Sequence, residues 1–158
     1  MRRSNWYGSK SAKTGRSRCS LLGFERNLPL CARQKLTAQA MSLYNTYEVT
    51  VWWATPVEVA SALARLSRMQ QLNAKELTAA RRLADDLANT WWLVQPSDAL
   101  RARAGALVDR YNLRAADALQ LAAAIEWCED QPDGRVFLTA DQRLREAALL
   151  CGFETGHL

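Results

Sequence analysis

Histidine is scarce in this sequence of 158 residues, which contains only His157. The four cysteines lie far apart and form no C-x-x-C pair, so the sequence offers no histidine–cysteine zinc site. A catalytic triad is equally unsupported, because a G-x-S-x-G motif is absent and the single histidine lies almost at the end of the sequence. A reducing, cytoplasmic location is expected, since a chain of this size does not need disulfides to fold.

Long apolar runs and glycine-rich phosphate loops are also missing. No run approaches the roughly 18 apolar residues that cross a bilayer, so no membrane-spanning helix is expected. Neither G-x-G-x-x-G after a strand nor G-x-x-x-x-G-K-[ST] occurs, which argues against these two nucleotide sites. Hydrophobic residues make up 49% and charged residues 23%, proportions that are typical of a folded globular domain. Carboxylates are the side chains that remain for chemistry.

Charge divides the chain into two parts. Residues 1–47 hold nine Lys or Arg and one acid, Glu25, for a charge of +8, and contain no aspartate. Residues 48–158 hold twelve Lys or Arg and fifteen acids, for −3. We therefore predict a basic, irregular leader over 1–46 and a folded domain over 47–158. Such a leader is typical of a solvated tail that contacts nucleic acid non-specifically.

Strand and helix patterns alternate through the second part. Short β-branched or aromatic runs predict strands, and apolar positions repeating every three or four residues after a capping residue predict helices. This alternation indicates an α/β fold with a mostly parallel sheet flanked by helices. The expected strands are 49–53, 91–94 and 135–139, with a short fourth at 153–155; the expected helices are 55–69, 73–87, 97–110, 115–127 and 141–150.

Three carboxylates stand out by position. Glu58 lies one turn into the helix that follows the first of these strands, and Asp141 directly follows the strand at 135–139. Asp117 lies near the start of the most apolar helix. Because ligands bind beyond the carboxyl ends of parallel strands, we expect Glu58 and Asp141 to face one crevice, within reach of Asp117 at its helix start. Converging carboxylates favour Mg²⁺ or Mn²⁺, and such a site suits hydrolysis of a phosphodiester.

Each carboxylate also has a structural explanation. Glu58 fits the third helical position of a capping box that begins at Thr55. Asp141 fits the first turn of a helix, or its N-cap, where an anion is favoured. Asp117 needs a partner if it is buried, and an ion pair with Arg114 or Arg110 would provide one.

The segments around these acids, in this order, resemble the PIN domain family, especially the VapC-type toxin ribonucleases. They are WWATPVEVASALARL at 52–66, LRAADALQLA at 113–122 and FLTADQRL at 137–144. The resemblance implies a Rossmann-like sheet and a Mg²⁺- or Mn²⁺-dependent endoribonuclease that hydrolyses RNA. It implies Glu58, Asp117 and Asp141 as metal ligands. It also implies frequent homodimers and, for toxins, a neutralising antitoxin protein.

The N-terminal part departs from the family pattern. The family begins with a short strand that ends in an aspartate, and residues 1–47 contain no aspartate. We therefore expect the first strand and its acid to be lacking, which would leave inner strand edges unpaired. Two structural alternatives stay open: residues 19–25 substitute for the strand, with Glu25 as the acid, or the chain is poorly stable alone and depends on a partner. For the function, the alternative to an active ribonuclease is an inactive remnant that binds RNA or an antitoxin.

Overall fold

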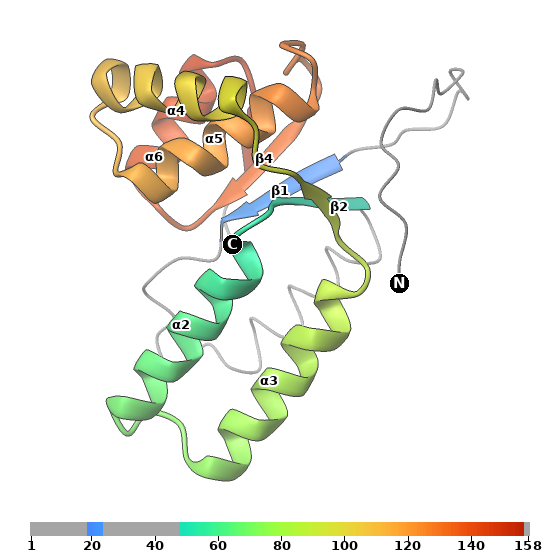
Figure 1. The fold of residues 1–158 in the computed structure, drawn as a ribbon, viewed down its shortest axis with the longest axis vertical. Coiled ribbons are helices and arrows are strands. Elements are labelled where there is room, and N and C mark those ends of the chain that lie inside the picture. The colour runs from blue at the N-terminus through green and yellow to red at the C-terminus, as the bar shows by residue number, and fades with distance from the viewer. Residues whose placement is uncertain (1–18, 24–47, 157–158) are drawn as a thin grey trace.

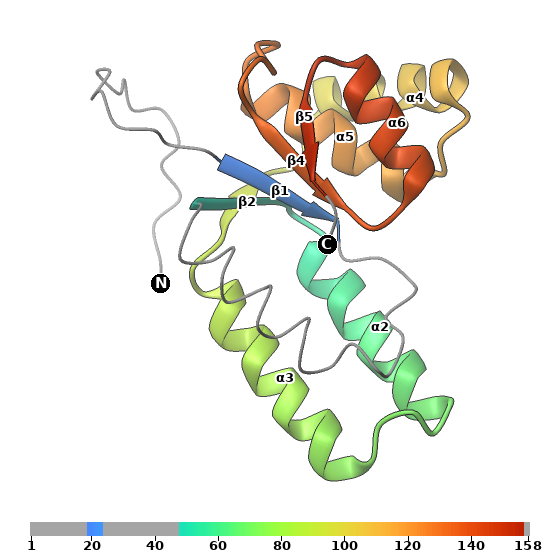
Figure 2. The same cartoon turned by 180° about the vertical axis from the view of Figure 1, so that it is seen from behind.

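The computed structural model describes residues 19–23 and 48–156, which form a parallel sheet with helices on both faces (Figures 1 and 2). The five strands have the order β3-β2-β1-β4-β5, and every neighbouring pair is parallel. The α/β fold class expected from the sequence is therefore confirmed. The strands are β1 (Cys19–Gly23), β2 (Glu48–Trp52), β3 (Trp92–Val94), β4 (Val136–Thr139) and β5 (Glu154–Gly156).

The central position in the sheet belongs to β1, which lies within residues 19–25, the segment named as a substitute for the family's first strand. Leu21 pairs with Thr50 of β2 on one side and with Phe137 of β4 on the other. The predictions of an irregular leader and of a missing first strand are therefore wrong for these five residues. The physical reason is that pairing on both edges stabilises a segment too short to show a period of its own. The rest of 1–46, including Glu25, lies outside the described residues.

Five helices are present in the described part of the chain. Figures 1 and 2 show α4, α5 and α6 gathered on one side of the sheet, while α2 and α3 extend from the other side as a pair. In residues 19–23 and 48–156, no helix is both long and apolar enough to cross a membrane. The helices are α2 (Thr55–Arg68), α3 (Ala74–Ala88), α4 (Asp98–Tyr111), α5 (Ala115–Trp127) and α6 (Gln142–Leu150).

The residues from which two of the helices were expected to start, Asn73 and Ser97, are helix caps. Asn73 and Glu76 form a reciprocal capping box at the start of α3, and Ser97 caps α4. The box expected at Thr55 is wrong, because α2 begins at Thr55 and its N-cap is Ala54. Ala54 has a right-handed helical conformation and not the extended one that is typical of an N-cap.

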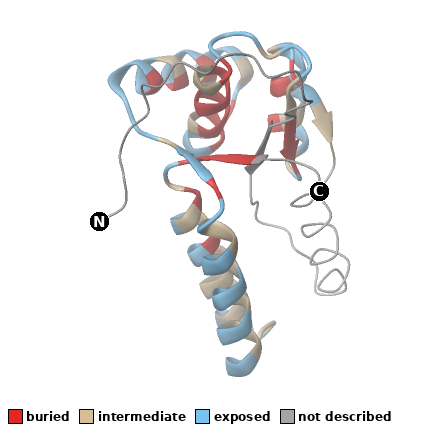
Figure 3. Ribbon diagram, turned by 90° about the vertical axis from the view of Figure 1, so that its right-hand side faces the viewer, coloured by how far each residue is buried: buried red, intermediate tan, exposed pale blue. Residues whose placement is uncertain are grey.

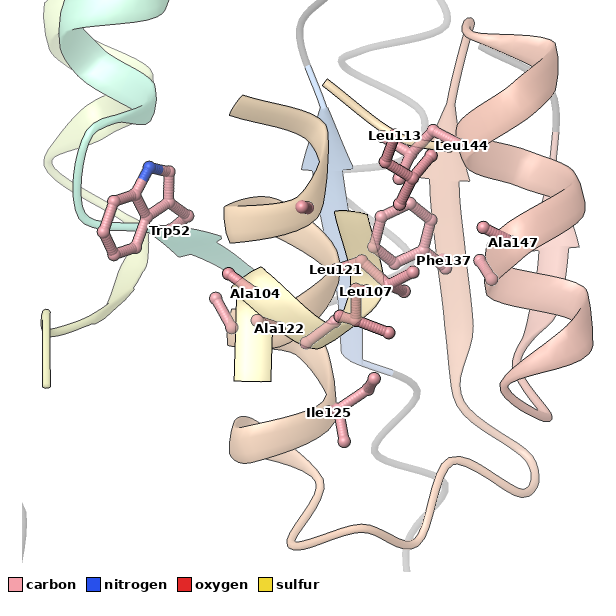
Figure 4. Packing of buried hydrophobic residues seen from close by; sticks show 14 of the residues in the cluster. Trp52, Ala104, Leu107, Leu113, Leu121, Ala122, Ile125, Phe137, Leu144 and Ala147 are labelled. Carbon is pink, nitrogen blue, oxygen red and sulfur yellow. The ribbon is translucent and has the colours of Figure 1, made fainter. Parts of the chain in front are cut away.

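The core has one cluster on each face of the sheet. The larger cluster surrounds α5, most of which is buried as its apolar sequence predicts, and includes Trp52 and Phe137 from the sheet (Figure 4). The smaller cluster joins Val51 of β2 to Val59 of α2. Neighbouring residues of β2 enter opposite clusters because side chains alternate along a strand. The sheet therefore holds the starts of α2 and α5 in fixed positions at its carboxyl edge.

Candidate active site

The strand order places the candidate site at one edge of the sheet. The order reverses between β1 and β4, and ligands of open parallel sheets bind beyond the carboxyl ends of the strands at such a point. Gly23, the last residue of β1, pairs with Thr139, the last residue of β4. On the other side of β1, Trp52 at the end of β2 pairs with Val94 at the end of β3. The four strands thus end together.

Glu58 and Asp117 meet at this edge although they come from different helices. Glu58 lies in the first turn of α2, and Asp117 lies in the first turn of α5. The side chain of Gln120, one turn further along α5, donates a hydrogen bond of 2.9 Å from Nε2 to Oε2 of Glu58. Asp117 is buried and Glu58 is half-buried. The structure therefore brings together two of the three carboxylates that the sequence selected.

The electrostatics of Glu58 show that the two carboxylates interact. Burial raises the pKa of Glu58, the hydrogen bond from Gln120 lowers it, and the negative charge of Asp117 raises it. The net pKa lies above the ordinary value for a glutamate. Two carboxylates that repel each other in this way are a suitable place for a cation.

The structural explanation for Glu58 is wrong. Ala54, the N-cap of α2, has no side chain that could form a capping box, and no side-chain cap bond is present there. The Glu58 carboxylate instead accepts the bond from Gln120. Its position is thus not explained by helix capping.

The ion pair offered as an explanation for Asp117 is also absent. Among residues 48–156, the ion pairs join Arg101 to Asp98 and Arg103 to Asp130, and none includes Asp117. The guanidinium of Arg110 lies over the ring of Tyr111, 5.3 Å from its centroid. Asp117 is therefore a buried carboxylate beside another carboxylate, with no arginine of the described residues paired to it.

Asp141 has the structural role that we considered for it. It is the N-cap of α6, where its Oδ1 accepts a hydrogen bond of 2.9 Å from the backbone N–H of Leu144. Its own N–H donates to Oγ1 of Thr139 over 3.1 Å. These bonds use one carboxylate oxygen and fix the backbone where β4 turns into α6.

Asp141 lies at the same end of the molecule as Asp117 but is not gathered with the other two acids. Arg143 donates a 3.2 Å bond to the backbone carbonyl of Asn112, which ties the start of α6 to the connection before α5. Nevertheless, within residues 19–23 and 48–156 no three acidic, histidine or cysteine side chains lie close enough to hold a metal ion. The expected convergence of all three is therefore not seen.

Gln120 is a site residue that sequence reasoning missed. It is only 3% exposed, and its Oε1 is buried with no hydrogen-bond partner among the described residues. A signal was available, because Gln120 is a polar residue within a buried apolar helix and lies three positions after Asp117, on the same helical face. Its bond to Glu58 depends on the packing of α2 against α5, which a helical period does not reveal.

The fold and the site together define an α/β domain with acidic side chains at the carboxyl edge of a parallel sheet. The model of the PIN domain family matches residues 20–150, a range that includes most of β1. The chain belongs to the PIN domain family, as the resemblance implied.

A toxin–antitoxin complex from Klebsiella pneumoniae contains a chain that is similar to this one, with a TM-score of 0.47 and 15% identity. The similarity covers 77% of this chain and 86% of that one. No curated protein sequence matches this chain.

Proposed function

We propose that this chain is a metal-dependent endoribonuclease that hydrolyses phosphodiester bonds in RNA, with Glu58, Asp117 and Asp141 as its acids. Membership of the PIN domain family supports a nuclease or toxin function. The observation that carries the proposal is the pairing of Glu58 with Asp117. Burial raises the pKa of Glu58 most, and the negative charge of Asp117 raises it further. Neither a helix cap nor an ion pair within the described residues explains that pairing.

The chemistry of the donors fits a divalent cation. PIN domains generally depend on divalent metals, and Mg²⁺ commonly uses only one or two protein carboxylates together with water and phosphate oxygens. Glu58 and Asp117 would hold Mg²⁺ or Mn²⁺, and Asp141 would contribute the oxygen that does not cap α6. When bound, such a cation would activate a water molecule and neutralise negative charge on the leaving oxygen. Gln120 would fix the orientation of the Glu58 carboxylate.

Cleavage of a mixed RNA pool by the purified full chain tests this proposal. We expect cutting in Mn²⁺ or Mg²⁺, none in EDTA, and loss of cutting in Asp117→Asn. Asp109→Asn is a matched control, because Asp109 is exposed on α4 and undergoes the same chemical change. Equal cutting by Asp117→Asn and the wild type would contradict the proposed site. If neither the wild type nor Asp117→Asn cuts RNA although both proteins are shown to be folded, the enzyme assignment would be contradicted.

A second candidate is a PIN domain that binds RNA or an antitoxin without cutting. Two observations favour it: residues 1–47 contain no aspartate, and the described residues contain no group of three metal-binding side chains. Because ligands of one site act as a unit, loss of one acid reduces the rate by orders of magnitude. A sample that binds RNA but does not cleave it would favour this candidate.

We propose that an antitoxin protein binds this chain at the surface of α2 and α3. The alternative partner is a second copy of the chain. None of the residues of α3 is buried, and Figure 3 shows the outer part of the α2–α3 pair largely exposed. Val57, Met69 and Leu83 are large apolar residues exposed on or beside these helices. A protein partner that covers these side chains would bury apolar surface that the described part of the chain leaves exposed. Light scattering of the purified chain measures whether that partner is a second copy.

A further inference from the structure

Trp53 is an exposed aromatic residue at the edge of the sheet that carries the acids. It follows β2 directly, and half of its surface, 50%, is exposed. Its backbone N–H donates a 3.0 Å hydrogen bond to the carbonyl of Val94, the last residue of β3. The position of Trp53 is thus fixed by the sheet at the carboxyl ends of two strands.

The indole of Trp53 is supported from within the core. Trp52 is only 7% exposed and belongs to the cluster around α5 (Figure 4). The two indole centroids are 6.1 Å apart with an interplanar angle of 69°, an edge-to-face contact. This contact supports the Trp53 ring from the core, while half of the surface of the residue stays exposed.

Trp53 also lies close to the acidic pair along the backbone. The next residue, Ala54, accepts a 3.1 Å hydrogen bond from the N–H of Glu58. Ala54 and Glu58 are therefore about one helical turn apart, about 5 to 6 Å along the axis, and Trp53 directly precedes Ala54. Trp53 therefore lies two residues before α2, whose first turn carries Glu58.

We propose that Trp53 is a stacking platform for a nucleobase of single-stranded RNA beside the bond that the acids cleave. This inference rests on the proposed function and adds a residue that holds the RNA. An indole binds any base through its π-face, so the subsite tolerates different sequences. It requires an unstacked base, so it selects single-stranded RNA over a duplex. The exposed indole and the nearby carboxylates then contact adjoining parts of one nucleotide strand.

Trp92 offers a matched control for this proposal. It is 49% exposed, almost the same as Trp53, and lies in the neighbouring strand β3. It pairs with Thr50, however, two residues before the carboxyl end of β2. If any exposed indole strengthens RNA binding, removing Trp53 or Trp92 should weaken it equally. If a base stacks beside the acids, only removal of Trp53 should weaken it.

The experiment measures binding of the full chain, in EDTA, to a single-stranded RNA oligonucleotide and to a matched oligonucleotide without bases. We expect Trp53→Ala to raise the Kd for the normal oligonucleotide about 5- to 100-fold and to leave the Kd for the abasic one unchanged. Trp53→Phe should retain most of the affinity, and Trp92→Ala should bind as the wild type does. Circular dichroism checks that each variant is folded.

Several outcomes would overturn the stacking role. They are an unchanged Kd in Trp53→Ala, an equal loss for both oligonucleotides, and an equal loss in Trp92→Ala. A change of oligomeric state in Trp53→Ala with unchanged RNA binding would assign the indole to a protein interface instead. The same samples are then assayed for cleavage in Mn²⁺. Absence of cleavage contradicts the nuclease proposal without altering the binding result, because binding is measured without metal.

Discussion

Gln120 of α5 donates a 2.9 Å hydrogen bond to Glu58 of α2, a residue 62 positions earlier in the sequence. The bond joins the starts of two helices that lie at the carboxyl edge of the sheet. It is the contact that holds Glu58 near Asp117 although the two negative charges repel each other. A neutral amide that restrains a carboxylate in this way can orient it for a cation.

Gln120→Ala should therefore weaken the site without removing an acid. The pKa of Glu58 should rise further, because the hydrogen bond from Gln120 lowers it in the wild type. We expect the Mn²⁺ concentration for half-maximal cleavage to increase about 10- to 100-fold, a typical effect of losing a residue that orients a ligand. The limb of the pH–rate profile that reports Glu58 should move to higher pH.

Gln142→Ala is the matched control for this change. Gln142 also donates from Nε2 to a carboxylate, Oε1 of Glu146, over 3.0 Å, but both residues are exposed on α6. This variant should keep the metal dependence of the wild type. If Gln120→Ala kept it too, the bond to Glu58 would have no role in metal binding.

The repulsion between Glu58 and Asp117 should make stability depend on pH when metal is absent. Burial, followed by the charge of Asp117, raises the folded-state pKa of Glu58 above 4.5, its ordinary value. Between 4.5 and that raised pKa the folded state binds more protons than the unfolded state, so the free energy of unfolding falls as pH rises. Glu58→Gln should lack this decrease, and its advantage in Tm over the wild type should grow from pH 4.5 upward.

Asp117→Asn tests the same repulsion from the other residue. Removing the negative charge should lower the pKa of Glu58 and leave the metal-free protein as stable as the wild type or more stable. Thermal unfolding in EDTA measures this. Clear destabilisation of Asp117→Asn would instead indicate that the Asp117 carboxylate has a stabilising partner.

Local patterns predicted most of the fold because most elements carry their own signal. The apolar sequence of α5 predicted a buried helix, and the capping residues Asn73 and Ser97 marked the starts of α3 and α4. Thr55 failed as a cap because the tight turn after β2 makes Ala54 the N-cap. That turn depends on how β2 and β3 end together, which is tertiary information.

The sequence predicted those residues of the candidate site whose importance follows from their place along the strands and helices. It did not predict contacts between helices. Positions at the ends of strands selected Glu58 and Asp141, and an acid within an apolar helix selected Asp117. Gln120 was missed because its importance comes from a contact between two helices far apart in sequence. The separation of Asp141 from the other acids is equally a matter of packing, since Asp141 caps α6 while the charge of Asp117 acts on Glu58.

The central position of β1 leads to a prediction about Leu21. Its backbone pairs with β2 and with β4, so a proline there removes an N–H from the interior of a sheet. We expect Leu21→Pro to lower the free energy of unfolding by about 1–3 kcal/mol or more, because a buried carbonyl loses its partner. Leu21→Ala keeps the N–H and serves as the control. Equal denaturation curves for Leu21→Pro and Leu21→Ala would contradict the pairing of β1.

Two variants of Asp141 separate its capping role from a role in the reaction. Serine caps a helix about as well as aspartate, whereas alanine does not, so Asp141→Ala should lose about 0.5–2 kcal/mol of stability and Asp141→Ser should lose little. Neither variant has a carboxylate, so both should lose metal-dependent cleavage if the second oxygen of Asp141 serves the site. Denaturation and cleavage are measured on the same samples. Wild-type cleavage by Asp141→Ser would mean that Asp141 only begins α6, and Glu58 and Asp117 would then be the acids of the described chain that hold the metal.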